Sequence, residues 1–261
     1  MIKVAINGFG RIGRMVLRSI IENKIKNIKV IAINNRANTG TSAFLLEKDT
    51  IHGNLNHEIK FDKKSIKLLD TIFYAFMKVT LKTYHGKAWY WYCVWMHRKF
   101  NSKEQSSKHL MAGAKRVLVS APCKNADQTV VYGINHKNIS KKDKIISVAS
   151  CTTNCLAPLA YVMDKNFTIQ NGYMTTIHSY TTDQRLLDNS HKDLRRARSG
   201  PNNMVPTSTG AAKALELILP KLKNKIDGIS IRVPTPNVSL VQLSFVAKKT
   251  INEKLIKQCS S

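Results

Sequence analysis

Apolar positions near the start of the chain predict a strand, a helix and a second strand. Residues 2–6 and 29–33 are short runs dominated by Ile, Val and Ala, which are typical of buried strands. Between them, residues 15–21 place apolar side chains at helical spacing. This order predicts a βαβ unit, the building block of a parallel sheet with helices on its faces.

Three glycines lie between the first strand and the helix, in the order Gly-x-Gly-x-x-Gly. Gly8 permits a tight turn, Gly10 lets a pyrophosphate approach the backbone, and Gly13 lets the helix pack on the strand. An acidic residue that binds the adenosine ribose is expected about 20 residues later. Asn35 occupies that position instead, and Arg36 follows it. The pattern predicts NAD as the cofactor and leaves acceptance of NADP open.

A second strand-to-helix junction lies at Cys151. The β-branched run 144–149 predicts a buried strand, and the apolar stretch 156–163 predicts a helix. A cysteine at the start of a helix meets free backbone N–H groups and the positive end of the helix dipole, which lower its pKa and favour the nucleophilic thiolate. Burial as a structural cysteine is the alternative. The two threonines and the asparagine that follow argue against it, because they suit a polar site better than a core.

The composition is that of a globular protein of a reducing compartment. The chain has 261 residues, 43% of them hydrophobic, which is enough for a sizeable core. It starts directly with a predicted strand, so we expect neither a secretory leader nor a membrane partner. Five cysteines, one at a candidate nucleophile position, favour free thiols and a cytoplasmic location. Cys155 lies four residues after Cys151, and no further metal ligands accompany this pair. We therefore expect Cys155 to be packed and expect no bound metal.

The chain is strongly basic, with a formal net charge of +26 from 42 Lys and Arg residues against 16 Asp and Glu residues. Such a charge is typical of nucleic-acid binding. The lysines, however, are spread along the whole chain with abundant Ile and Asn, as an A+T-rich genome would produce, and no basic stretch alternates with aromatic residues. We therefore expect no nucleic-acid partner, and the positive charge suits an anionic cofactor and a phosphorylated substrate.

Several further motifs follow one another in order along the chain. They are the segments 7–14, 44–53, 112–122, 149–158, 175–184, 191–198, 206–213 and 232–237. Together they resemble the phosphorylating glyceraldehyde-3-phosphate dehydrogenases, and the resemblance covers residues 1–69 and 101–250. It implies an α/β fold, with a Rossmann-type dinucleotide-binding domain over residues 1–150. An incomplete α+β catalytic domain with a mixed or antiparallel sheet is implied over residues 151–261.

The resemblance also implies roles for single residues. Cys151 is the implied nucleophile and His178 the base, in an oxidation of glyceraldehyde 3-phosphate through a thioester that inorganic phosphate then attacks. Thr181 and Arg232 resemble the subsite for the substrate phosphate. The subsite for the attacking phosphate is implied to contain Ser150, Thr152, Thr209 and Gly210, and the implied cofactor contacts are Gly8, Gly10, Arg11, Ile12, Gly13, Asn35 and Ser120. The family is usually tetrameric, which implies a homotetramer.

Residues 70–99 depart from the family pattern and carry all three tryptophans. Back-translation of residues 77–86, read two nucleotides later, permits Asp-Pro-Lys-Asn-Leu-Pro-Trp, and residues 89–98, read one nucleotide later, permit Gly-Cys-Thr-Gly. Both resemble the family, and three single-nucleotide deletions would produce these offsets. We therefore predict that residues from about 70 to 99 are out-of-frame translation, which resequencing of the gene tests.

The family pattern continues beyond the end of this chain, through further strands and a terminal helix. We therefore expect an incomplete catalytic domain with unpaired strands and little or no dehydrogenase activity from residues 1–261.

Three alternatives stay open. An erythrose-4-phosphate dehydrogenase shares the nucleophile motif, although Tyr180, Thr181 and the segment 207–213 favour glyceraldehyde 3-phosphate. A non-catalytic binding protein, for RNA for instance, would show salt-sensitive binding that NAD does not affect. An inactive product of a damaged or misread gene is the third.

Overall fold

The computed structural model describes residues 1–69, 71–76, 92–95, 101–251, 253 and 256. It contains two compact units. The first unit comprises residues 1–129 and 139–148, and the second comprises residues 130–138 and 149–261. The domain limits predicted at residue 150 stay a prediction.

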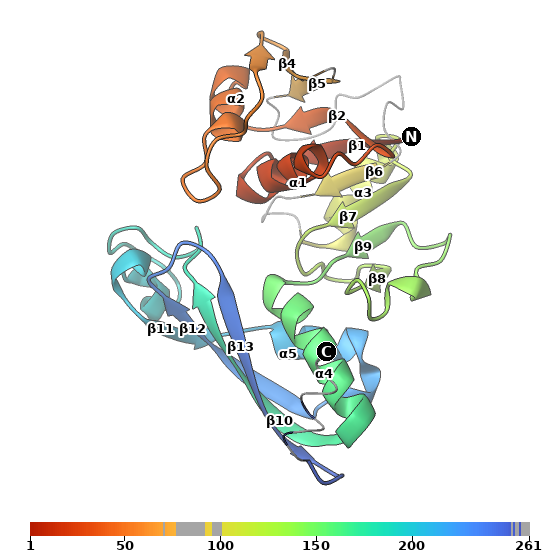
Figure 1. Ribbon diagram of the computed structural model, residues 1–261, viewed down its shortest axis with the longest axis vertical. Coiled ribbons are helices and arrows are strands. Elements are labelled where there is room, and N and C mark those ends of the chain that lie inside the picture. The colour runs from red at the N-terminus through yellow and green to blue at the C-terminus, as the bar shows by residue number, and fades with distance from the viewer. Residues whose placement is uncertain (70, 77–91, 96–100, 252, 254–255, 257–261) are drawn as a thin grey trace. The chain divides into compact units, whose positions relative to one another are not determined.

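A largely parallel sheet forms the first unit, with the strand order β3-β4-β5-β2-β1-β6-β7-β9-β8 among the described residues (Figure 1). Its strands are β1 (Ile2–Asn7), β2 (Ile28–Asn34), β3 (Ile59–Phe61), β4 (Ser65–Leu68), β5 (Thr71–Phe76), β6 (Tyr92–Trp95), β7 (Arg116–Val119), β8 (Gln128–Thr129) and β9 (Ile145–Ser147). The strands from β5 to β8 in this order pair in parallel, whereas β3 and β4 form an antiparallel hairpin that joins β5.

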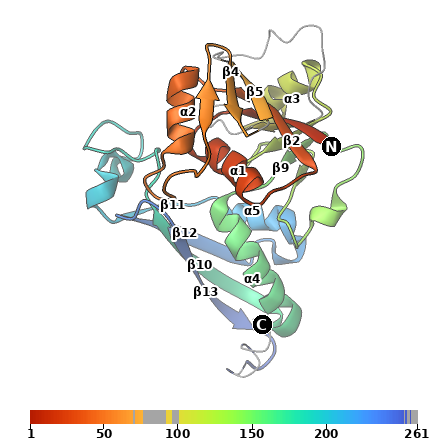
Figure 2. The ribbon, with the colours of Figure 1, turned by 45° about the horizontal axis from the view of Figure 1, so that its top comes forward.

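The helices of this unit are α1 (Arg11–Glu22), α2 (Thr39–Glu47) and α3 (Lys103–Met111). Figure 2 shows α2 beside β4. Side chains of successive β1 residues pack into two different hydrophobic clusters, because they alternate between the faces of a strand. Ile6 packs with Leu17 of α1 and Leu46 of α2, whereas Ala5 packs in the cluster that holds Val117 of β7. Both faces of the sheet are therefore buried, as parallel sheets require.

In the described part of the second unit, two helices pack against a four-stranded mixed sheet (Figure 1). The helices are α4 (Cys151–Phe167) and α5 (Ala211–Ile218), with short turns η1 (His136–Asn138), η2 (Leu194–Ala197), η3 (Gly200–Asn202) and η4 (Pro220–Leu222). The strands follow the order β11 (Val205–Ser208), β12 (Ile226–Val233), β10 (Ile169–Ser179) and β13 (Ser239–Ala247). β12 pairs with β10 in parallel, and β11 and β13 pair antiparallel to their neighbours.

These two sheets confirm the predicted fold class, a Rossmann-type unit followed by a catalytic unit with a mixed sheet. The predicted elements are found close to their expected positions, although α4 begins at Cys151, earlier than the apolar run from residue 156 indicates. Of the segment predicted to be out of frame, β5 and β6 are described, and residues 70, 77–91 and 96–100 lie outside the described residues. The reading-frame hypothesis stays a prediction. Among the described helices, none is long and apolar enough to cross a membrane.

Candidate active site

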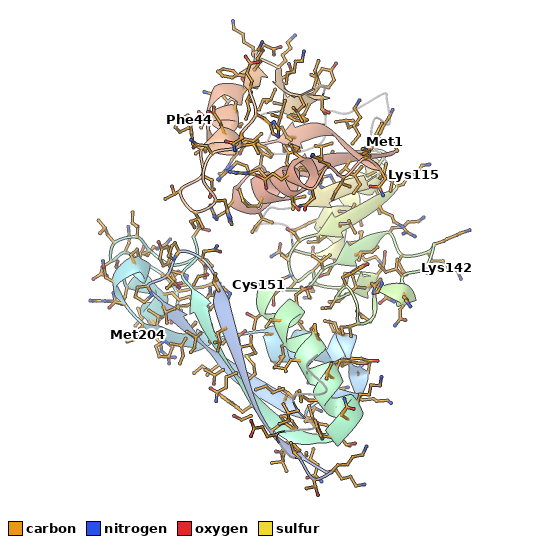
Figure 3. The ribbon with its side chains drawn as sticks, viewed as in Figure 1. Met1, Phe44, Lys115, Lys142, Cys151 and Met204 are labelled. Carbon is orange, nitrogen blue, oxygen red and sulfur yellow. The ribbon has the colours of Figure 1, made fainter. Side chains whose placement is uncertain are left out.

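Cys151 is the first residue of α4, directly after the turn that leaves β9. The turn contains Ala149, whose φ of 58° lies in the left-handed region that non-glycine residues rarely adopt. Ser150 caps the helix, because its Oγ accepts a hydrogen bond from the backbone N–H of Thr153 at 3.1 Å. Figure 3 shows the cysteine at the end of α4 where the helix begins, so the thiol lies at the positive end of the helix dipole.

His178 lies near the end of β10 and reaches the cysteine from the adjacent sheet. Its Nε2 is 3.1 Å from Cys151 Sγ, and its Nδ1 is 2.7 Å from the backbone oxygen of Ser179. The carbonyl can only accept, so this contact favours the tautomer with the proton on Nδ1. In that tautomer the lone pair of Nε2 faces the sulfur and can take the thiol proton.

The electrostatics of Cys151 favour the thiolate. The hydrogen bond between Cys151 and His178 is the largest influence and lowers the pKa of the thiol, whereas partial burial raises it. The charge of His178 and the backbone N–H and hydroxyl of Thr152 lower it further, so the pKa falls from 9.0 to about 7. About half of the Cys151 thiols are therefore ionised near neutral pH.

Arg232 lies on β12 directly opposite His178, because the parallel register pairs these two positions. Its Nη1 is 2.8 Å from His178 Nδ1 and donates to the backbone oxygen of Ser179 at 3.1 Å. Nδ1 can donate to Ser179 or accept from Arg232, but a single ring nitrogen cannot do both at once. The guanidinium therefore influences the tautomer of the base, and its planar set of N–H donors has the chemistry that suits a phosphate.

The other residues predicted for the phosphate subsites lie in the same unit. Thr181 follows β10, and its backbone N–H donates to Gln184 Oε1 at 3.3 Å. Thr209 and Gly210 precede α5, and Thr209 Oγ1 accepts from the N–H of Ala211 at 3.2 Å. Among the described residues, no hydrogen bond or ion pair joins Thr209 or Gly210 to the start of α4. The grouping of these residues into two subsites therefore stays a prediction.

Cys155 corrects one expectation from the sequence. It was expected to be packed, but the structure exposes it, since four residues along a helix return the side chain to the exposed face that carries Cys151. Among the described residues, no group of three or more His, Cys, Asp and Glu side chains could hold a metal ion.

The glycine loop of the first unit depends on glycine at two of its three positions. Gly8 has a φ of 105°, which favours glycine. A Cβ on Gly13 would lie 2.2 Å from the backbone oxygen of Gly8, so the helix can pack this closely only without a side chain. At Gly10, in contrast, a Cβ would meet no atom within 4 Å, and no side chain caps the start of α1. The loop therefore offers free space and helix N–H groups for an anion.

The remaining predicted cofactor residues lie at the edge of the sheet or at the start of α1. The ends of β1, β2, β6 and β7 lie in register, so Asn35 and Ser120, which follow two of these strands, lie at the same edge of the sheet as the loop. Ile12 is exposed. The guanidinium of Arg11 forms an ion pair with Asp49 at 2.7 Å, so this carboxylate balances its charge.

Three contacts of the predicted site residues were not predicted from the sequence. Thr152 was assigned to a phosphate subsite, but it also stabilises the thiolate. Ser179 orients the imidazole through its backbone oxygen, and Asp49 fixes Arg11. The adjacency of Ser179 to the predicted base was a visible signal, whereas the partner of Arg11 has no local signal in the sequence.

A dinucleotide-binding loop in one unit and an activated cysteine–histidine pair in the other define a class, the dinucleotide-dependent oxidoreductases that work through a cysteine thiol. The family described as "Glyceraldehyde 3-phosphate dehydrogenase, NAD binding domain" matches residues 2–84. The family described as "Glyceraldehyde 3-phosphate dehydrogenase, C-terminal domain" matches residues 150–260. The chain therefore matches both domains of this family, and NAD is the cofactor that the first domain binds.

Relatives with the same name cover nearly the whole chain. The glyceraldehyde-3-phosphate dehydrogenase of Xanthobacter flavus is 48% identical over 265 aligned positions, which span 99% of this chain and 79% of the relative. The enzyme of Cereibacter sphaeroides is 50% identical over 95% of this chain and 74% of the relative, and that of Geobacillus stearothermophilus is 46% identical over 96% and 75%. The chain belongs to the glyceraldehyde-3-phosphate dehydrogenase family, as the motifs predicted.

Proposed function

We propose that this chain oxidises and phosphorylates glyceraldehyde 3-phosphate to 1,3-bisphosphoglycerate through a thioester on Cys151. The observation that carries the proposal is the distance of 3.1 Å between Cys151 Sγ and His178 Nε2, together with a thiol pKa of about 7. The relatives reported above share one name, which favours glyceraldehyde 3-phosphate over the erythrose 4-phosphate alternative.

The chemistry follows from the residues of the pair. His178 takes the proton of the thiol, and the Cys151 sulfur attacks the aldehyde carbon to form a hemithioacetal. The oxygen of the adduct takes this proton back from His178 and becomes the hemithioacetal hydroxyl. The neutral His178 then takes the hydroxyl proton as the carbon loses a hydride, which leaves a thioester. NAD, when bound, is the hydride acceptor. Inorganic phosphate attacks the thioester carbon, the acyl phosphate leaves, and the thiolate returns. Two donors stabilise the negative charge on the oxygen of the tetrahedral species: the backbone N–H of Cys151 and the imidazole of His178.

The phosphate groups require two anion subsites. We assign the substrate phosphate to Thr181 and Arg232, because the guanidinium already touches the base and can hold the aldehyde beside it. We assign the attacking phosphate to the helix starts of α4 and α5, where helix N–H groups and hydroxyls suit an anion. Ser150, Thr152, Thr209 and Gly210 supply these groups.

The test is a single-turnover measurement, because it detects the thioester directly and does not depend on the steady-state rate. The full chain is mixed with NAD and glyceraldehyde 3-phosphate without phosphate, and the acyl-enzyme is located by mass spectrometry. We expect a 3-phosphoglyceroyl adduct on Cys151, formed together with an equal amount of NADH and released by phosphate. The matched variant Cys155→Ser should keep the adduct and Cys151→Ser should lose it. An unmodified wild-type Cys151, or an adduct on Cys155, would refute the proposal.

We propose that the chain assembles with copies of itself, as a homotetramer. The support is an apolar surface on the outer face of the second unit's sheet. Tyr173, Ile177, Leu240 and Val246 share one face of β10 and β13 by register, and each is at least 40% exposed. Val246→Lys should lower the mass measured by light scattering, whereas Leu217→Lys, at an exposed position on α5, should not. A mass of one chain at all concentrations for the wild type would refute this assembly.

A cytoplasmic location is also part of the proposal. Its support is the chemistry of the cysteines: Cys123, Cys151 and Cys155 are free, and a nucleophilic thiol needs a reducing compartment.

A further inference from the structure

The stretch of the dinucleotide unit that leads from the end of α1 to α2 has no acidic residue. Between Glu22 and Glu47 the sequence contains no Asp or Glu, and it contains Lys24, Lys26, Lys29 and Arg36. This stretch includes β2 and the start of α2, where the adenosine end of a dinucleotide is bound in a Rossmann-type unit. The usual carboxylate has two effects there: it accepts hydrogen bonds from the ribose hydroxyls, and it repels a 2′-phosphate.

Asn35 occupies the position of that carboxylate and is fixed by two hydrogen bonds. Its Oδ1 accepts from the backbone N–H of Arg36 at 2.9 Å, and its Nδ2 donates to Ser42 Oγ at 3.0 Å. Ser42 is buried in α2, so the amide is held between the end of β2 and the helix. The side chain at this position is therefore neutral and well placed, and it cannot repel a phosphate by charge.

Arg36 lies beside this amide and is exposed. Among the described residues, no carboxylate forms an ion pair with it. The chain that leads to Arg36 is tied to the glycine loop, since the N–H groups of Gly8 and Phe9 both donate to the backbone oxygen of Asn34, at 3.0 and 3.1 Å. Arg36 is therefore two residues along the chain from the carbonyl that holds the glycine loop, in the segment where the adenosine ribose is expected to bind.

We propose that this site accepts a 2′-phosphorylated dinucleotide, so that the chain binds NADP as well as NAD. Asn35 removes the repulsion that selects against the 2′-phosphate, and Arg36 donates charge-assisted hydrogen bonds to it. The inference rests on the proposed dinucleotide-dependent function, and it adds the specificity of the adenosine end.

The test uses ligands that occupy only this end of the site. Isothermal titration of the full chain with ADP-ribose and with 2′-phospho-ADP-ribose gives two dissociation constants that do not depend on catalysis. We expect the two constants of the wild type to agree within about tenfold, which corresponds to about 1.4 kcal/mol. Asn35→Asp keeps the shape of the side chain and adds the charge, so it should weaken the phosphorylated ligand by about tenfold or more relative to ADP-ribose.

Two further variants complete the design. Arg36→Ala should weaken the phosphorylated ligand and leave ADP-ribose unchanged, whereas Lys26→Ala, an exposed basic residue of the same stretch, should not change the ratio. Binding of ADP-ribose alone by the wild type, or an unchanged ratio in Asn35→Asp, would overturn the inference and leave the proposed function intact. Failure of both ligands to bind would overturn the dinucleotide site and this inference together. The acyl-enzyme assay tests the proposed reaction at Cys151 separately.

Discussion

Replacing His178 with alanine should slow the reaction of Cys151 with a disulfide reagent at pH 7 and accelerate it at pH 10. The hydrogen bond over 3.1 Å and the charge of His178 both lower the pKa of the thiol, and both are lost in the variant. Burial, which raises the pKa, and the contacts of Thr152, which lower it, remain. The pKa of Cys151 should therefore return from about 7 toward 9.0.

The size of the effect has two parts with opposite signs. At pH 7 the thiolate fraction falls from about one half to about 1%, a factor of about 50. The more basic thiolate is also the better nucleophile, and a Brønsted coefficient of about 0.45 makes it about eightfold more reactive. The net rate at pH 7 should therefore fall about sixfold, and the two pH profiles should cross near pH 8.

The assay follows the thiol released from an aromatic disulfide in stopped flow, from pH 6 to pH 10. A Cys155→Ser background removes the exposed neighbour on the same helix face, and subtraction of the rate of Cys151→Ser in that background isolates Cys151. His57→Ala, at an exposed histidine of the first unit, is the matched control and should leave the profile unchanged. The reasoning is wrong if the profile of His178→Ala has the same midpoint as the wild type.

Three further predictions concern the dinucleotide unit. Gly13→Ala should lower Tm, because its Cβ would lie 2.2 Å from the Gly8 oxygen. Gly10→Ala should keep Tm, because its Cβ would meet no atom within 4 Å, and it should weaken ADP-ribose binding in titration because it fills the space beside the loop. Asp49→Asn should lower Tm at pH 7, because the folded protein lowers the pKa of Asp49 from 3.8 to about 2 and so stabilises its carboxylate. Thermal unfolding at several pH values should show that the difference in Tm between wild type and variant shrinks as the pH falls from 3.8 to about 2. His109→Gln should destabilise the unit by about 1–3 kcal/mol at pH 8, measured by urea unfolding. Since burial lowers the pKa of His109 from 6.5 to about 3, the wild type should lose stability as the pH falls below 6.5, and the variant should lose less.

Local patterns in the sequence were sufficient to predict the glycine loop of the dinucleotide unit and the strand and helix beside it. Gly8, Gly10 and Gly13 sit between a strand and a helix, and each of the three positions has a geometric role that depends only on residues nearby in the chain. The start of α4 was harder to locate, because Ser150 supplies the cap through its side chain while the apolar periodicity begins only at Leu156. Capping residues determine where a helix begins, and hydrophobic spacing alone places the start too late.

Contacts between distant segments were not predictable in the same way. His109 on α3 accepts from Asn7 Nδ2 at 3.2 Å, and Asn34 Nδ2 donates to Asn7 Oδ1 at 2.7 Å. The direction of this chain of hydrogen bonds leaves Nε2 of His109 without a proton, so the ring is neutral. None of these residues stood out in the sequence, because a buried polar network depends on which strand ends meet and not on any local pattern.

The catalytic pair itself depends on the packing of α4 on its sheet. On β10, Met174, Thr176 and His178 alternate onto one buried face, and Met174 packs in the core that α4 completes. The same packing that buries this core therefore brings the start of α4, with Cys151, to His178. Arg232 joins them through the register of β12, and a slip of one residue would turn its side chain to the opposite face. Sequence motifs can name these three residues, but the hydrophobic core and the strand register decide that they meet.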